Sequence, residues 1–158
     1  MSDLSSQRPP TAVARATSPI DIAPPRRSAW RRVLRVLRRA TSWLHVALAS
    51  AVVLGVFLQV YLIGSYIFGA GQGALDAHKS MGWTVHGFEM LVFVAALLAW
   101  LPWVDLVLSL LLAAIGTAQV ALASQHRWVG GLHPLLALVV VGLAATLTHR
   151  GIRQRRDT

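Results

Sequence analysis

Four long apolar segments constrain the fold of this chain more than any other feature. They run over about residues 43–68, 81–101, 104–124 and 132–148. A helix needs roughly 17–25 predominantly apolar residues to cross the hydrocarbon core of a bilayer, so each segment is long enough to do so. With 55% hydrophobic and 13% charged residues, the chain is also more apolar than an ordinary soluble domain. The sequence therefore predicts an all-α integral membrane four-helix bundle with up-down topology.

The basic residues gather at the two ends of the chain. Of the 15 Lys and Arg residues, 13 precede Thr41 or follow His149. An excess of Lys and Arg is typical of the cytoplasmic flanks of membrane helices. We therefore expect both termini to be cytoplasmic, in a multi-pass protein of the bacterial plasma (inner) membrane. The net charge of +9 then has an explanation that requires no nucleic-acid partner.

Composition divides the chain into four parts. Residues 1–27, rich in Pro, Ser, Thr and Arg, predict a disordered cytoplasmic tail. Residues 28–41 predict a basic amphipathic juxtamembrane helix, because apolar side chains recur at helical spacing among arginines. Residues 42–149 form the predicted transmembrane domain, and residues 150–158 form a basic cytoplasmic tail.

Two interpretations stay open for the juxtamembrane helix, and they are compatible. It can bind the anionic lipids of the inner leaflet, or it can serve as a flank that sets orientation. The arginines that would contact the lipids are Arg31, Arg35, Arg38 and Arg39.

Polar residues recur on one face of the second segment. At about 100° per residue, His78, Gly82, His86 and Glu89 fall within roughly 80° of one another. Ionisable residues in a membrane helix usually face the bundle interior and mark a functional site. This face is therefore the leading candidate for a site.

The other three segments supply polar residues at a similar depth. Gln59 and Gln119 lie in the outer halves of the first and third segments, and His133 begins the fourth. Such a layer can surround a cofactor in a bundle core. Two neutral imidazoles from two helices suit the axial ligation of haem iron. The pattern predicts one b-type haem between His78 and His133, serving electron transfer, haem handling or redox sensing.

Further residues have supporting roles in this hypothesis. His86 is the substitute ligand, Gly82 leaves room for a flat ring, and Lys79 stands near the expected propionates. The chain has no cysteine, which excludes covalent haem attachment and thiolate metal sites. Zinc suits the pattern less well, because no third ligand is evident.

A second hypothesis treats the whole polar layer as structural. His86 can bond to Glu89 or Gln119, and the glutamines can bond between helices. Glu89 is then either a proton-handling group or a buried acid kept neutral by desolvation. The protein would be a cofactor-free membrane assembly or interaction subunit. A transporter is a third possibility, and no catalytic motif assigns an enzyme activity.

The same residues carry two resemblances. Gln59-Val-Tyr-Leu-Ile-Gly64, His78-x-x-x-Gly82, Gln119 and Leu132-His133-Pro134 resemble an uncharacterised family of small four-helix membrane proteins common in actinobacteria. That resemblance spans about residues 56–150 and implies the four-helix architecture.

The second resemblance is to one four-helix half of the haem A synthase family. In that family, a His at the outer start of the second helix pairs with a His on the fourth to bind haem b. His78-Lys79, Gly82 and His133 are similar to those elements, whereas Leu75 stands where the family has an acidic residue. The resemblance implies a cofactor-binding half-unit. As a partner of the chain we expect a membrane redox protein or a second copy of the chain.

Overall fold

The computed structural model describes residues 27–123 and 127–156, which form five helices. They are α1 (Arg27–Ile67), α2 (Gln72–Leu98), α3 (Trp103–Ala123), α4 (Arg127–Gly130) and α5 (Leu132–Arg156). All except the single turn α4 are long and apolar enough to cross a membrane. The predicted all-α architecture with four long helices is confirmed.

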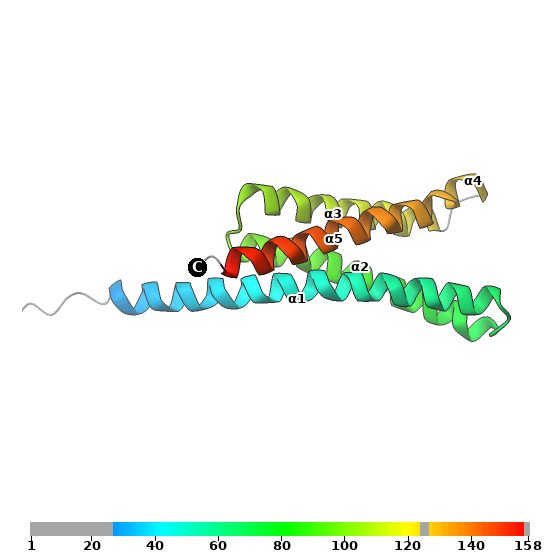
Figure 1. Cartoon of the computed structure of the whole chain (residues 1–158), viewed down its shortest axis with the longest axis horizontal. Helices are drawn as coiled ribbons and strands as arrows, with labels where there is room; N and C mark the ends of the chain where they lie inside the picture. Colours follow the sequence, from blue (N-terminus) through cyan, green and yellow to red (C-terminus); the bar gives the residue numbers. More distant parts are fainter. Residues whose placement is uncertain (1–26, 124–126, 157–158) are drawn as a thin grey trace, which may run out of the picture.

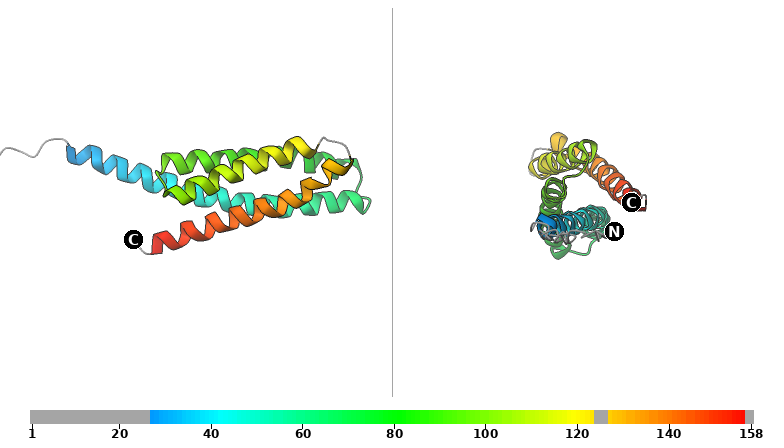
Figure 2. Two further views of the ribbon diagram at one scale, coloured as in Figure 1. Left: turned by 90° about the horizontal axis from the view of Figure 1, so that it is seen from above. Right: turned by 90° about the vertical axis from the view of Figure 1, so that its left-hand side faces the viewer.

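The long helices form two antiparallel hairpins, α1 with α2 and α3 with α5 (Figure 1). We call the end where each hairpin turns the hairpin end, and the opposite end, which carries the α2–α3 turn and the end of α5, the terminal end. Viewed end-on, the four helices surround a common interior (Figure 2). Each contributes a fully buried side chain to the core: Val52, Val92, Leu112 and Val140.

The helix α2 begins at Gln72, so the connection from α1 is shorter than the gap between the apolar segments 43–68 and 81–101. Gly69 and Gly71 adopt φ angles of 95° and 83°, which glycine reaches at little cost and which reverse the chain in a few residues. The Gln72 side-chain amide then donates to Asp76 at 3.2 Å across the first turn. As a consequence, His78 lies on a helix rather than in a loop.

The turn from α2 to α3 has a complete helix-ending hydrogen-bond pattern. The N–H of Leu101 donates to the Ala96 carbonyl at 3.2 Å, and the N–H of Trp100 donates to Leu97 at 3.1 Å. This pair of bonds is the Schellman motif, whose left-handed position is usually glycine. Here Trp100 occupies it with a φ of 52°. Pro102 then starts α3 by accepting from the N–H of Asp105.

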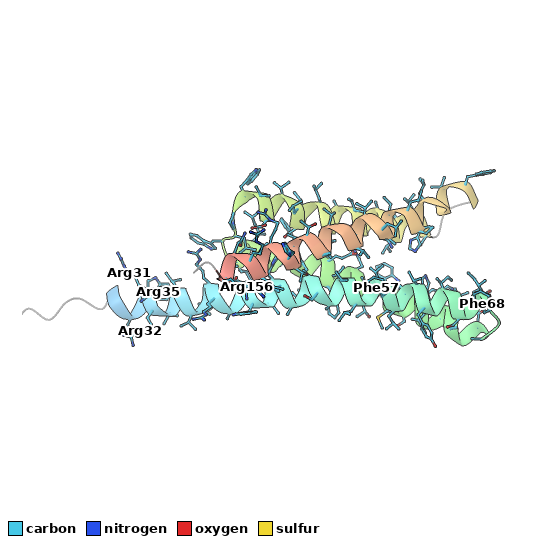
Figure 3. The ribbon with its side chains drawn as sticks, in the orientation of Figure 1. Arg31, Arg32, Arg35, Phe57, Phe68 and Arg156 are labelled. Carbon is cyan, nitrogen blue, oxygen red and sulfur yellow. The ribbon has the colours of Figure 1, made fainter. Side chains whose placement is uncertain are left out.

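The helix α1 passes from the predicted juxtamembrane part (28–41) into the transmembrane part without a break. Its first turns project beyond the bundle, and Arg31, Arg32 and Arg35 point away from the other helices (Figure 3). Residues 28–41 therefore continue the axis of α1 and are not a separate helix lying across it.

The C-terminal end of the described chain departs from its predicted tail. The helix α5 continues to Arg156 through most of the predicted tail 150–158. Residues 1–26 and 157–158 of the two predicted tails lie outside the described residues.

Candidate functional site

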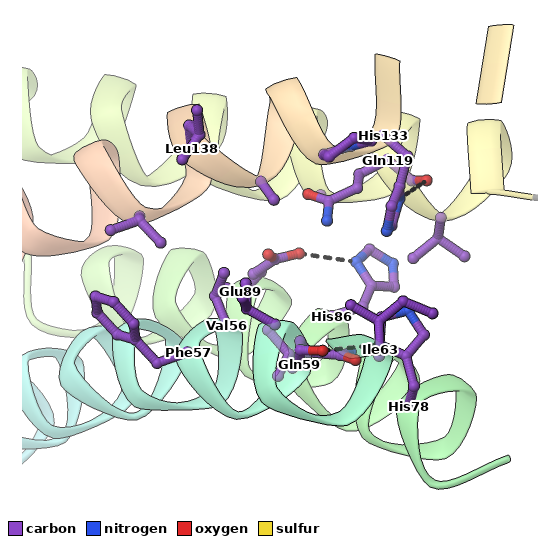
Figure 4. A pocket seen from close by; sticks show the side chains of 18 of the residues that line it. Val56, Phe57, Gln59, Ile63, His78, His86, Glu89, Gln119, His133 and Leu138 are labelled. Atoms are coloured by element: carbon purple, nitrogen blue, oxygen red, sulfur yellow. Dashed lines mark hydrogen bonds and ion pairs between the residues drawn. The ribbon is translucent and has the colours of Figure 1, made fainter. Parts of the chain in front are cut away.

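A cavity of about 510 Å³ lies between the two hairpins at the hairpin end (Figure 4). All four long helices line it, mostly with apolar side chains. The predicted site residues that line it are Gln59, His78, Gly82, His86, Glu89, Gln119 and His133. The predicted Lys79 is exposed and is not part of the lining. The structure thus brings the polar residues of four helices to one cavity.

His78 and His133 meet across this cavity from opposite hairpins. Their ring centroids are 6.3 Å apart and the rings are nearly perpendicular, at 78°. Figure 4 shows the two rings pointing toward one another from the two pairs of helices. Two imidazoles that bind one metal ion from opposite sides, with each nitrogen at about 2 Å, have ring centres about 6 Å apart. The spacing of this pair therefore suits two axial ligands of one iron atom.

Each of these rings is held by a main-chain carbonyl of the neighbouring helix. His78 Nδ1 lies 3.1 Å from the Gln59 carbonyl oxygen, and His133 Nδ1 lies 3.1 Å from that of Gln119. A carbonyl oxygen can only accept, so Nδ1 donates in both rings. In the neutral rings, Nε2 then keeps its lone pair. Metal-binding histidines are usually oriented by such a bond from the other nitrogen.

In the side chain of each of these two glutamines, the amide oxygen lacks a hydrogen-bond partner among the described residues. Gln59 Oε1 and Gln119 Oε1 are buried and make no hydrogen bond to the described residues. Gln59 Nε2 lies against Gly82, where a Cβ would come within 2.9 Å of it. A buried carbonyl oxygen without a partner is costly, so each of these atoms would be satisfied by a water molecule or by a donor group of a ligand.

His86 and Glu89 form a separate pair on α2. His86 Nδ1 lies 3.1 Å from Glu89 Oε2, and the side chains are 16% and 3% exposed. The carboxylate packs against Gly116 of α3, where any Cβ would collide with it. Of the two partners expected for His86, the structure therefore selects Glu89 and not Gln119.

The cavity opens sideways between α1 and α5. Phe57 and Val60 on α1 and Leu138 on α5 line it and are each more than 60% exposed. Pockets that bind cofactors are typically about 300–1,000 Å³ and mostly apolar, and this one falls within that range. A flat apolar molecule could enter it from the side of the bundle.

The two hairpins repeat the same arrangement, which the sequence alone does not reveal. Gln119 follows Gln59 by 60 residues, and His133 follows His78 by 55. At these two offsets, buried residues of one hairpin coincide with buried residues of the other. The pairs are Ala49 with Ser109, Val52 with Leu112, Val85 with Val140 and Val92 with Leu147. The cavity therefore lies between two equivalent halves.

Sequence reasoning missed a second polar cluster, at the terminal end. Asp105 on α3 accepts from Arg150 Nε at 2.6 Å and from Gln154 Nε2 at 2.7 Å. Next to it, His45 Nε2 lies 3.0 Å from Ser109 Oγ, and both side chains are buried. Asp105 was the available signal, since it is an acid at the start of an apolar helix in a chain with a basic end.

The described residues include no group of three or more His, Cys, Asp or Glu side chains that could hold a metal ion. Haem requires only two axial ligands from the protein, whereas zinc requires more. Comparison with known proteins finds no protein family, no curated protein and no solved structure that matches the chain.

Proposed function

We propose that this protein is a multi-pass protein of the bacterial plasma membrane that holds one b-type haem between His78 and His133. The hairpin end would face outward and both termini the cytoplasm. Haem would supply one-electron chemistry at the iron, and the protein would serve electron transfer, haem handling or redox sensing. The resemblance to one half of the haem A synthase family favours the same ligand pair.

One observation carries the proposal: the paired, oriented imidazoles of His78 and His133. Their 6.3 Å spacing suits a shared iron, and both Nδ1 atoms are engaged with main-chain carbonyls. A pair of histidines that served only to join helices would not need to meet each other as well. The apolar cavity around them matches the apolar faces of haem, and Gly82 adds no side chain to it.

The orientation rests on the distribution of charge. The projecting start of α1 and the end of α5 carry most of the arginines, and both lie toward the terminal end. Anionic lipids of the inner leaflet would be bound by the arginines of α1, which are Arg31, Arg35, Arg38 and Arg39. Arg38 has a second role, because its Nε donates to the Ala99 carbonyl at 3.3 Å at the end of α2.

The experiment is to purify the protein with haem available and to record its absorbance. His78→Ala and His133→Ala should each abolish the bis-histidine spectrum. His86→Ala is the matched control, since it removes an imidazole from the same cavity but leaves both proposed ligands. A wild-type protein that stays colourless after reconstitution, or a spectrum that survives both ligand substitutions, would refute the proposal.

The second candidate is a cofactor-free assembly or interaction subunit. The observation that favours it is that His78 and His133 each already bond to a neighbouring helix, so the polar layer can join the helices by itself. In that case, His78→Ala would lower stability without any spectral change, and the wild-type protein would not retain haem.

A further inference from the structure

The two halves of the bundle differ at several buried positions, and one of these differences is an acid beside the cavity. At the offset that relates His78 to His133, Glu89 corresponds to Ala144 and His86 to Val141. Both Glu89 and Ala144 are buried. One half therefore carries an ionisable pair where the other half carries aliphatic side chains.

A third difference between the halves makes room for Glu89 and His86. The position on α3 that corresponds to Val56 of α1 is Gly116. The Glu89 carboxylate fills the space beside it, so a side chain larger than glycine would displace the acid. Three coordinated departures from the repeat thus make room for a carboxylate beside the cavity. Holding helices together does not require this arrangement, because the other half packs without an acid at Ala144.

His86 is more exposed than Glu89, its partner in the pair. The His86 side chain is 16% exposed and lines the cavity, whereas that of Glu89 is 3% exposed. One hydrogen bond, between His86 Nδ1 and Glu89 Oε2, links the two side chains. An imidazole can take a proton on one ring nitrogen and release one from the other, so His86 can pass protons between the cavity and Glu89.

We propose that Glu89 binds one proton whenever the haem site gains one electron, with His86 as the relay. The inference rests on the proposed function. With haem bound, a one-electron reductant would supply the electron to the iron, and a proton from solvent, passed on by His86, would form an O–H bond with a Glu89 carboxylate oxygen. Reduction removes one positive charge from the site, so the carboxylate loses an attractive partner and binds a proton more tightly. By linkage, the proton strengthens electron binding by the same factor.

The other groups around the cavity do not duplicate this role. Besides Glu89, the titratable side chains that line it are His78 and His86 on α2 and His133 on α5. Two of these are the proposed ligands. The helices α1 and α3 contribute Gln59, Gln119 and Gly116 to the lining but no charged side chain.

The test is the midpoint potential of the haem-loaded protein, with dithionite as reductant, from mildly acidic to mildly alkaline pH. One proton per electron shifts the potential by about 59 mV for each tenfold change in proton concentration. Glu89→Gln, which keeps the shape of the side chain, should make the potential independent of pH. Asp105→Asn is the matched control, because it neutralises a buried acid at the opposite end of the bundle. In this variant the midpoint potential should depend on pH with the same slope as in the wild-type protein.

The infrared difference spectrum between the reduced and oxidised wild-type protein gives a second readout. A band of a protonated carboxyl group should appear on reduction and should be missing in Glu89→Gln. His86→Leu should slow the appearance of this band in the wild-type background at least tenfold.

The outcomes separate the two proposals. A haem-loaded wild-type protein whose potential does not change with pH, or which lacks the carboxyl band, overturns the proton site and leaves the haem site intact. A slope that persists in Glu89→Gln also overturns it. A protein that never binds haem overturns both proposals. If Glu89→Gln fails to fold, the wild-type potential and carboxyl band decide the question.

Discussion

The carboxylate of Glu89 on α2 occupies the space that a side chain at position 116 on α3 would need. A Cβ at Gly116 would lie 3.1 Å from Oε1 of Glu89 and closer still to Oε2. The acid and the glycine therefore fit together, and a larger side chain at position 116 should displace the Glu89 carboxylate.

Gly116→Ala tests this relationship directly. Insertion of a methyl group into a packed interior typically costs about 1–3 kcal/mol, and here the group displaced is a carboxylate. We expect a lower free energy of unfolding in a detergent denaturation series followed by circular dichroism. Gly142→Ala is the control, because outside the backbone of its own helix and its two chain neighbours no described atom lies within 4 Å of the added Cβ. It should be neutral or gain up to about 1 kcal/mol from helix propensity.

Asp105→Ala should weaken the terminal end of the bundle. The substitution removes the acceptor of two short bonds, from Arg150 and Gln154, and charged hydrogen bonds contribute about 1.5–3 kcal/mol each before solvent screening. Because the Arg150 side chain is 37% exposed, the loss should lie toward the lower end of that range. Asp76→Ala, at an exposed acid with one bond to Gln72, should change stability far less. Equal effects of the two substitutions would contradict the assigned role of Asp105.

Trp100→Gly should stabilise the protein. An L residue in the left-handed region costs roughly 1–2 kcal/mol, and Trp100 has a φ of 52° while its side chain is 76% exposed. Ala99→Gly is the neighbouring control, because Ala99 has a right-handed helical φ of −80° and gains nothing from glycine. Thermal unfolding of both variants checks the sign. A destabilised Trp100→Gly would show that the indole contributes more at a membrane surface than the backbone strain costs.

The membrane orientation can be tested with single cysteines, since the chain has none of its own. A cysteine at Gln72, at the hairpin end, should react with an impermeant maleimide added to intact cells. A cysteine at Arg153, near the end of α5, should react only after the cells are opened. The reverse pattern would place the cavity on the cytoplasmic side.

The helices and the face of α2 were predictable because both depend on local periodicity. The order of His78, Gly82, His86 and Glu89 along one helix face is a property of a 3.6-residue repeat. Gln59 and Gln119 lie at a similar depth in their apolar segments, and this depth predicted that they would line the same site. Such arguments require no knowledge of which helices are neighbours.

What could not be predicted depends on contacts between helices and on chain reversal. The start of α2 was placed too late because Gly69 and Gly71 complete the turn in fewer residues than hydropathy indicates. The bonds of Asp105 escaped notice because its partner Arg150 is 45 residues away and resembled a solvated tail residue. Most of the buried positions that make the hairpins equivalent carry different residue types, such as Ala49 with Ser109 and Val92 with Leu147, so sequence identity does not reveal the equivalence.

Because α1 is one continuous helix, it can transmit force from one of its ends to the other. Its 41 residues extend about 60 Å at 1.5 Å per residue, roughly twice the thickness of a bilayer core. The arginines occupy one arm, and Phe57 and Gln59, at the rim and wall of the cavity, occupy the other. Because no bend separates the arms, a torque applied to the projecting arm must turn the cavity wall with it. A force on the basic end of α1 would thus be transmitted to the side opening of the cavity.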